Sequence, residues 1–352
     1  MISALSIENF RSLNNISIEG IRRITAFSGK NNVGKSTILE ALFLLMDHAS
    51  QNSFLKLNIY RGTNHLDEEN LWKPLFTDMD ISKAIHISIT DCGVTSSLEY
   101  KSDPVYSPYS VVGLPDTLLS QYRSSLKSTY SLAYQFDTES YHENGHFSTD
   151  GEKILRDVNT SLTNNEIRFM KPTRFVSATV MRMYDTVVQS LGNMELSGRK
   201  GDVVKILRQL DPAITDIVTI SLHGIPQLYI SVGKRLLPLQ YAGDGVVKLL
   251  NVILAIMEMK DGLVLIDEME TGFHYSMYEK LWKIIDTVSY ESNCQVIATT
   301  HSYELIKAAT DGIEKKEDFA YFRIGKAKNG IAAYGFDFES LDNALKSEME
   351  VR

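Results

Sequence analysis

The 352-residue sequence has little cysteine, no excess of positive charge and no long uninterrupted apolar run. Its two cysteines, Cys92 and Cys294, stand far apart, which argues against a disulfide framework and a cysteine-based metal site. A reducing cytoplasm is therefore the expected location. Residues 1–8 contain no basic segment followed by an apolar one, so we do not expect secretion. The apolar stretches are too short or too interrupted to cross a bilayer, and no membrane partner is expected.

The charge balance is acidic. Lys and Arg number 36 and Asp and Glu number 44, which gives a net charge of −8. This balance disfavours a globally basic nucleic-acid binder, although it is compatible with a local basic groove. We interpret the basic residues mainly as solvated surface, and the candidate phosphate contacts in such a groove are Arg22, Arg23, Arg199, Lys200, Lys205 and Arg208.

Apolar periodicity predicts strands and helices at both ends of the chain. Alternation in the first 28 residues predicts three short strands, and the third runs into a glycine-rich loop and a helix. In the last third, strands alternate with helices, which predicts a parallel sheet. Further strands are expected at 84–90, 96–101, 174–179, 217–222, 227–232, 236–239, 263–266, 295–299 and 319–324, and helices at 181–191, 203–210, 245–259, 276–288 and 303–309, with a short C-terminal helix.

The middle of the chain is less regular. Residues 48–80 look irregular and polar, and 103–165 are rich in Ser, Tyr, Asn and Thr, so we expect an inserted lobe with helices near 115–134 and 151–162. The length suggests two domains or one composite domain. The expected divisions are 1–102, an inserted lobe at 103–170, a second part of the main domain at 171–325 and a tail at 326–352.

A phosphate-binding loop lies between the third strand and the first helix. Gly29 and Gly34 are followed by Lys35 and Ser36 in the spacing of a P-loop, with a strand before it and a helix after it. Glycines let backbone N–H groups wrap phosphates closely, and the helix N-terminus adds positive potential. Lys35 would contact the β- and γ-phosphates and Ser36 would ligate Mg²⁺. The sequence therefore predicts a nucleotide site, and its expected lining is Gly29, Asn31, Asn32, Gly34, Lys35, Ser36 and Thr37.

Two acids follow the apolar strand Leu263–Ile266. A buried parallel strand is expected to be continuously apolar, and ligands bind at the carboxyl ends of such strands. Asp267 would hold Mg²⁺, directly or through water, and Glu268 would polarise the attacking water. The alternative is a strand that merely ends in a solvated acidic turn.

Four motifs occur in an order that resembles the ABC-type ATPase heads of the SMC, RecF and OLD groups: Asn9-Phe10-Arg11-Ser12, Gly29–Thr37, Ile266-Asp267-Glu268 and Thr300-His301-Ser302. Residues 267–274 narrow the resemblance to the stand-alone "AAA family ATPase" proteins of bacterial defence loci. The resemblance covers about 1–47 and 174–325. It implies an α/β fold, a P-loop NTPase with an ABC/SMC-like head, whose mixed sheet is joined by an N-terminal β-subdomain and an inserted helical or irregular lobe.

The resemblance also implies functional positions that the residues alone do not identify. Residues Ala242, Gly243, Asp244 and Gly245 would be the signature motif, which contacts the γ-phosphate bound by the other protomer; the alternative is a helix capped by Asp244. His301 would contact the γ-phosphate; the alternatives are a structural histidine or a helix cap by Thr300 or Ser302. His274 would lie in the D-loop or be structural; the sequence does not place the Q-loop, for which Asp78 and Asp80 are the two candidates.

The function implied is a slow ATPase that uses ATP and Mg²⁺ and closes as a homodimer or a higher even-numbered oligomer. Residues 337–339 do not make the Asp-x-Asp of a TOPRIM nuclease, and no long heptad run supplies SMC arms. A separately encoded effector, a nuclease or toxin of an anti-phage system, is therefore the expected partner. The alternatives are a RecF-like DNA-binding ATPase of repair or maintenance and a nucleotide-gated scaffold with negligible turnover. GTP in place of ATP is an alternative, because we identify no clear motif that would recognise the base.

Overall fold

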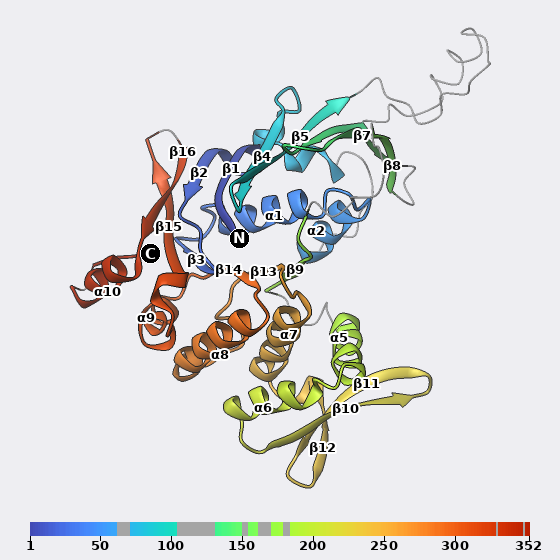
Figure 1. The fold of residues 1–352 in the computed structure, drawn as a ribbon, viewed down its shortest axis with the longest axis vertical. Coiled ribbons are helices and arrows are strands. Elements are labelled where there is room, and N and C mark those ends of the chain that lie inside the picture. Colours follow the sequence, from blue (N-terminus) through green and yellow to red (C-terminus); the bar gives the residue numbers. More distant parts are fainter. Residues whose placement is uncertain are drawn as a thin grey trace.

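The computed structural model describes residues 1–61, 71–103, 131–149, 154–160, 170–178, 184–328, 330–347 and 349–352. The described residues form three sheets, a six-stranded one in the middle, a seven-stranded one on one side of it and a three-stranded one in a lobe on the other side (Figure 1). The middle sheet separates two hydrophobic cores.

The middle sheet has the strand order β16-β15-β3-β14-β13-β9. Neighbouring strands from β15 to β9 are parallel, and β16 is antiparallel to β15. Its strands are β3 (Ile24–Ser28), β9 (Thr173–Val176), β13 (Leu263–Ile266), β14 (Gln295–Thr299), β15 (Phe319–Ala327) and β16 (Gly330–Phe336).

The central strands are apolar on both faces because helices or a second sheet cover each face. Leu263 and Leu265 of β13 belong to the core around the P-loop helix, and Val264 and Ile266 belong to the core around the later helices. This alternation explains why the strand reads as a continuous apolar run. The parallel sheet expected from the last third of the sequence is confirmed.

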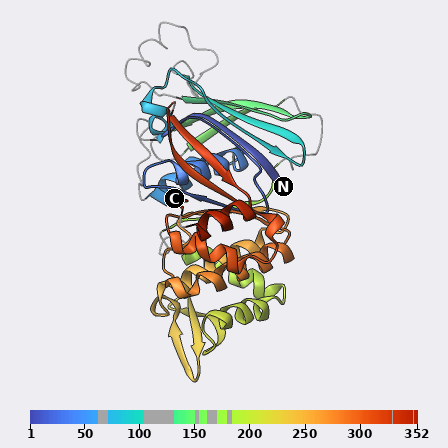
Figure 2. The same cartoon turned by 90° about the vertical axis from the view of Figure 1, so that its left-hand side faces the viewer.

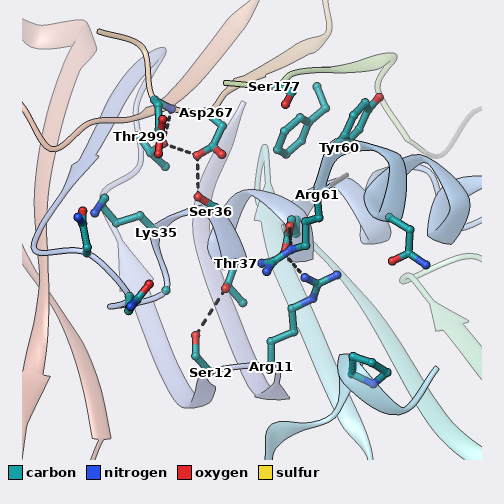
Figure 3. A pocket seen from close by; sticks show the side chains of 18 of the residues that line it. Arg11, Ser12, Lys35, Ser36, Thr37, Tyr60, Arg61, Ser177, Asp267 and Thr299 are labelled. Atoms are coloured by element: carbon teal, nitrogen blue, oxygen red, sulfur yellow. Dashed lines mark hydrogen bonds and ion pairs between the residues drawn. The ribbon is translucent and has the colours of Figure 1, made fainter. Parts of the chain in front are cut away.

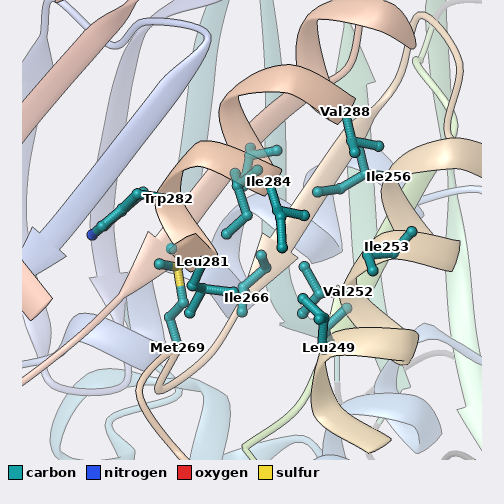
Figure 4. Close-up of a cluster of buried hydrophobic side chains, with 14 of the residues drawn as sticks. Leu249, Val252, Ile253, Ile256, Ile266, Met269, Leu281, Trp282, Ile284 and Val288 are labelled. Carbon is teal, nitrogen blue, oxygen red and sulfur yellow. The ribbon is translucent and has the colours of Figure 1, made fainter. Parts of the chain in front are cut away.

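Helices of the C-terminal half cover one face of this sheet. The apolar sides of α7 and α8 meet above Ile266 (Figure 4). These helices are α7 (Asp244–Glu258), α8 (Tyr278–Glu291), α9 (Tyr303–Gly312) and α10 (Phe338–Lys346), with the short 3₁₀ helices η5 (Tyr275–Met277) and η6 (Lys316–Asp318) between them.

The other face carries the P-loop helix and the seven-stranded antiparallel sheet, as the side view shows (Figure 2). The helices are α1 (Lys35–Met46) and α2 (Ser53–Arg61), and the 3₁₀ helices are η1 (Lys73–Leu75) and η2 (Thr77–Met79). The sheet order is β2-β1-β4-β5-β6-β7-β8, formed by β1 (Ile2–Phe10), β2 (Leu13–Glu19), β4 (Ile85–Asp91), β5 (Val94–Asp103), β6 (Ser131–Asp137), β7 (His142–Thr149) and β8 (Ile154–Thr160).

The helices expected in the inserted lobe are wrong wherever the structure describes those residues. Residues 131–134 belong to β6 and 154–160 form β8, and both strands pair with β7 in the N-terminal sheet. Residues 115–130 lie outside the described residues. The interval 48–80, expected to be irregular, contains helix α2. Antiparallel pairing to existing strands overrides the weak local preference of these segments.

Residues 184–241 form a lobe beside α7. It consists of α5 (Tyr184–Leu196), α6 (Lys200–Leu210), the strands β10 (Ile214–Leu222), β11 (Ile225–Val232) and β12 (Arg235–Pro238), and the 3₁₀ helix η4 (Leu239–Tyr241). The three strands expected near 217–222, 227–232 and 236–239 are confirmed, and they pair antiparallel in chain order. Among the described residues, no helix is both long and apolar enough to cross a membrane.

Candidate nucleotide site

The P-loop is shaped by two glycines that no larger residue could replace without strain. Gly34 begins α1 with φ 90°, and an added Cβ would lie 2.7 Å from the side chain of Leu13. Gly29 has φ 145°, and an added Cβ would lie 2.2 Å from the carbonyl oxygen of Ile324 on β15. The loop is therefore held tightly between β3, β15 and the N-terminal sheet, with its helix N-terminus free to face an anion.

Lys35 closes the loop upon itself. Its ammonium donates hydrogen bonds to the carbonyl oxygens of Gly29 at 2.7 Å and Lys30 at 2.9 Å. Burial lowers the pKa of Lys35, and the carboxylates of Glu270, Asp267 and Glu268 offset part of this effect. A phosphate would compete for the same ammonium and would add the negative charge that this position favours.

A chain of hydroxyl and carboxylate groups joins the first turn of α1, the residues after β13 and the end of β14. The Ser36 hydroxyl donates to Asp267 Oδ1 at 2.7 Å, and the Thr299 hydroxyl donates to the same oxygen at 2.6 Å (Figure 3). The Glu268 amide donates to Thr299 Oγ1 at 2.9 Å. Ser36 and Asp267 thus present hard oxygen donors side by side, which fits Mg²⁺ when phosphate oxygens complete the coordination. Protein side chains alone would not complete the coordination of a metal ion, since no cluster of three His, Cys, Asp or Glu residues suited to a metal occurs within the described ranges.

Glu268 faces the same cavity from a strained backbone. Its φ is 45°, in the left-handed region that few non-glycine residues adopt. The hydrogen bonds of the Glu268 and Met269 amides, to Thr299 Oγ1 and to the Thr299 carbonyl at 2.9 Å each, hold this conformation. The bend turns the side chain of Glu268 toward the cavity directly after Asp267.

His301 is fixed by an acid that the sequence analysis did not select. Glu270 Oε1 accepts a hydrogen bond from the backbone amide of His301 at 2.7 Å and lies 2.8 Å from its Nδ1. Glu270 is 8% exposed and His301 is 49% exposed, so the acid lies behind the ring. With Nδ1 engaged, the Nε2 edge is the one available to a ligand. Ser302 caps α9 by accepting a hydrogen bond from the Leu305 amide, as one of the alternatives held.

One cavity of about 1110 Å³ is lined by Gly34, Lys35, Ser36, Asp267, Glu268, Thr299 and His301, whereas Gly29 and Glu270 lie outside its lining. Its far wall carries Arg11 and Arg61, which both pair with the buried Glu40 of α1, at 3.1 Å and 2.6 Å. Burial lowers the pKa of Arg11 to about 10 despite the attraction of Glu40. Glu40 thus faces two arginines within the lining of the cavity. The motif at 9–12 contained Arg11, but Arg61 and Glu40 carried no sequence signal.

The two candidate Q-loop residues differ in their surroundings. Asp78 lines the cavity in a backbone conformation with φ 54°. Asp80 is not among the cavity-lining residues and instead accepts hydrogen bonds from Ser82.

The signature-like segment does not reach the cavity of its own chain. None of Ala242, Gly243, Asp244 or Gly245 lines it, and Gly243 and Asp244 are exposed. Gly243 is the N-cap of α7, so the alternative of a cap by Asp244 is wrong. His274 is also exposed and begins η5 by accepting a hydrogen bond from the Ser276 amide. The roles of these residues stay predictions.

The candidate DNA contacts largely have partners within the chain. The side chain of Arg22 donates to the Glu317 carbonyl, Arg23 pairs with Asp318, and Arg199 donates to the Met257 carbonyl. Lys200 lies 3.4 Å from Glu195 and 3.3 Å from Asp216. The remaining two, Lys205 and Arg208, are exposed on α6. The structure therefore adds no support to a nucleic-acid interface.

Comparison with known proteins shows the family to which this chain belongs. The family model described as "AAA domain, putative AbiEii toxin, Type IV TA system" matches residues 24–307. This chain belongs to that family of AAA ATPase domains. The matched range contains the P-loop, both acids and His301. A similar protein over nearly the whole length is the "ATP/GTP phosphatase" of Helicobacter pylori (strain ATCC 700392 / 26695), 26% identical over 343 residues that cover 91% of this chain and 90% of that protein.

Solved structures agree on the fold of this AAA domain. An SMC head bound to the C-winged helix domain of ScpA superposes with a TM-score of 0.54 at 12% identity and covers 96% of this chain and 98% of that one. An SMC head with an extended coiled coil, bound to the C-terminal domain of ScpA derived from Pyrococcus furiosus, gives 0.51 at 11% identity, with 99% of each chain covered. The predicted ABC/SMC-like head is confirmed as the fold.

Proposed function

We propose that this AAA domain hydrolyses ATP to ADP and phosphate and that two copies close around the nucleotide. The observation that carries the proposal is the hydrogen-bonded set of Ser36, Asp267, Thr299 and Glu268, which lines one cavity together with Lys35 and His301. This arrangement matches the requirements of phosphoryl transfer, in which positioning and charge stabilisation supply most of the rate. The name of the Helicobacter pylori relative supports hydrolysis of ATP and leaves GTP as a second substrate to assay.

Each residue has a role that follows from its contacts. Lys35 and the P-loop amides would bind the β- and γ-phosphates. Ser36 and Asp267 would hold Mg²⁺, which, when bound, supplies positive charge to these phosphates. Glu268 would accept a proton from the attacking water. The oxygen of that water would bond to the γ-phosphorus while the bond between the γ-phosphorus and the β–γ bridging oxygen breaks. The Nε2 edge of His301 would contact the γ-phosphate.

Closure of two copies rests on the exposed end of α7. Gly243 and Asp244 begin a 15-residue helix whose N-terminus does not face the cavity of its own chain. Such an end is an anion site when amides and the helix dipole converge on it. In a symmetric pair, each helix would face the γ-phosphate held by the other copy. An isologous arrangement of this kind uses the same surface twice.

The output of the ATPase would be the activity of a separately encoded effector in a phage-defence system. The family description, which names a putative toxin of a type IV toxin–antitoxin system, supports this setting. The solved SMC heads are described with ScpA domains bound to them, which supports docking of a second protein on a head of this fold. A cytoplasmic location fits these partners.

The test uses Glu268→Gln, which keeps the shape of the side chain and removes its basicity. With ATP and Mg²⁺ the variant should bind nucleotide, turn over at least about 100-fold more slowly than the wild type, and form a stable dimer by light scattering. Lys35→Ala is the control and should neither bind ATP nor dimerise in response to it.

Two outcomes separate the parts of the proposal. A wild-type protein that releases no phosphate from ATP or GTP would refute the enzymatic part. A Glu268→Gln variant that binds ATP yet stays monomeric would refute closure and leave hydrolysis intact. If the wild type is already an assembly, the change in its scattering or hydrodynamic radius on adding ATP replaces the dimerisation readout.

A further inference from the structure

Lys248 is a fully buried cation that the proposed mechanism does not use. It lies on α7 and has 0% exposure, although an ammonium normally requires water or a charged partner. Its Nζ donates hydrogen bonds to two backbone carbonyl oxygens, those of Ser177 at 3.0 Å and Asp267 at 3.2 Å. Burial lowers the pKa of Lys248 although the carboxylates of Asp267, Glu268 and Glu270 attract its charge.

The two carbonyls belong to residues that follow neighbouring parallel strands. Ser177 directly follows β9 and Asp267 directly follows β13, and these strands pair from Leu263 with Thr173 to Ile266 with Val176. Ser177 and Asp267 both line the nucleotide cavity (Figure 3). Lys248 therefore contacts the backbone of two cavity residues while lining none of the cavity itself. It supports the wall of the cavity from behind.

A second contact joins the same helix to the same loop. At the start of α7, an added Cβ on Gly245 would lie 2.8 Å from the Gly272 carbonyl oxygen. An added Cβ on Gly272 would lie 3.2 Å from the carbonyl carbon of Asp244. The backbones thus touch at these two glycines. About one turn further along α7, Lys248 contacts the first acid of the loop. The helix end and residues 267–272 are held together at two points.

We propose that Lys248 is a positioning residue for hydrolysis, one that holds the backbone of Asp267 and ties α7 to the acids of the cavity. Through Asp267 it also limits the position of the adjacent Glu268, whose strained backbone needs support on both sides. This inference rests on the proposed function, because it concerns the same cavity. It adds a path by which a contact at the exposed end of α7 reaches the attacking water.

The experiment compares Lys248→Met, which preserves length and apolar volume, with the wild type. Steady-state turnover, ATP affinity and the Mg²⁺ concentration for half-maximal rate are measured for both. We expect kcat to fall at least about 10-fold, the ATP dissociation constant to change less than about 3-fold, and the Mg²⁺ requirement to rise. We expect kcat to change more than ATP affinity because Lys35 and the P-loop amides, which would bind ATP, do not contact Lys248.

Arg174→Met is the matched control. Arg174 is also a buried cation, lies on β9, and contacts Glu258 and Ser190 rather than a cavity residue. Its loss should lower the melting temperature, since Glu258 loses its partner, with kcat per folded molecule unchanged. Hydrogen exchange provides a readout without turnover: the amides of 268–271 should exchange faster in Lys248→Met and at the wild-type rate in Arg174→Met.

A Lys248→Met protein with kcat within about 2-fold of the wild type, or one whose kcat and ATP affinity fall together, overturns the proposal. If that variant does not fold, Lys248→Gln is used, whose amide is one bond too short to reach both carbonyls; wild-type turnover in this variant overturns the proposal equally. An inactive wild type would refute the proposed function, and the exchange rates of 268–271 would still test the positioning role.

Discussion

At the scale of single residues, one hydroxyl connects both acids of the cavity. Thr299 Oγ1 donates to Asp267 Oδ1 and accepts from the Glu268 amide. Thr299→Val keeps the shape and removes both bonds, so the strained backbone of Glu268 keeps only the Met269 amide bond to the residue 299 carbonyl. We expect kcat to fall at least about 10-fold and stability to fall by about 1–3 kcal/mol. Kinetics and denaturant unfolding measure the two effects.

The control for this change is Thr310→Val on α9. The Thr310 hydroxyl donates to the Lys307 carbonyl at 2.7 Å on an exposed helix surface. This variant should keep wild-type turnover and stability within about 0.5 kcal/mol. A Thr299→Val protein that behaves like Thr310→Val would contradict the role assigned to the Thr299 hydroxyl.

Glu270 and His301 should act as a unit. Glu270→Ala leaves His301 without its Nδ1 partner, so the ring loses its fixed orientation, and kcat should fall at least about 10-fold. Glu270→Gln retains an acceptor oxygen and should recover most of this loss. The double variant Glu270→Ala/His301→Ala should be no slower than His301→Ala alone. Additive effects of the two changes would show that Glu270 acts independently of the ring.

The sequence predicted those site residues whose signal is local. Gly29, Gly34, Lys35 and Ser36 stand within eight positions, and the two acids end an apolar strand. Glu270 and Thr299 lie in or beside quoted motifs, yet their roles depend on partners about 30 residues away in the sequence. Glu40, Arg61 and Lys248 depend on tertiary contacts alone, because their neighbours in the chain form ordinary helices.

At the scale of elements, the end of the P-loop helix is coupled to the N-terminal sheet through a buried histidine. His48 follows α1 and stacks on Phe136 of β6, with ring centroids 3.8 Å apart. Burial lowers the pKa of His48 below its ordinary 6.5, although the Leu45 carbonyl and Glu143 oppose the shift. Arg156 lowers the pKa further. The ring is therefore held in its neutral form.

Because the ring of His48 is neutral in the folded protein, we expect the free energy of unfolding to decrease in acid. Below pH 6.5 the unfolded chain binds a proton that the folded His48 resists, so stability falls as the pH decreases, by up to about 1.4 kcal/mol per pH unit. His48→Phe keeps the stacking and removes the titration. Denaturant unfolding at pH 7.5, 6.5 and 5.5 should show a shallower decline in the variant. Parallel declines in the two proteins would exclude His48 as the source.

Helices and strands with a clear apolar pattern were predictable, and strands that form only by pairing with a neighbouring strand were not. Strand β13 and strand β14 have the bounds expected from the sequence. In the expected helix 151–162, Ile154, Leu155 and Val158 have helical spacing, yet residues 154–160 form β8 because β7 offers them a paired edge. Strand β16 was missed for the same reason: its residues are small and half-buried, and its structure comes from pairing with β15.

At the scale of the whole molecule, the nucleotide cavity gathers groups from both ends of the chain, so ligand binding should stabilise the fold as a unit. ATP with Mg²⁺ at 100 times its dissociation constant should add about 2.7 kcal/mol to the free energy of unfolding. Thermal unfolding should show the corresponding rise in melting temperature for the wild type and for Glu268→Gln. Lys35→Ala should show none; an equal rise in that variant would indicate binding elsewhere.

The overall architecture was predictable because its motifs are specific to one fold, and the order of the strands follows from that fold. The course of 131–160 was not, since nothing in the sequence indicates that β6, β7 and β8 extend the sheet begun by β1 and β2. The lobe of α5, α6 and β10–β12 was predicted element by element. Its place beside α7 is a tertiary property, fixed by packing of the apolar faces.

The position of β3 in the middle sheet has a consequence for how the protein is made. The P-loop strand pairs on one side with β14 and on the other with β15, whose residues begin at 295 and 319. During translation the P-loop leaves the ribosome long before either of its neighbouring strands. A nascent chain that lacks 319–327 has one unpaired edge beside the loop. Nucleotide therefore cannot assist folding until residues 319–327 have been synthesised, and until then this apolar edge is available to chaperones.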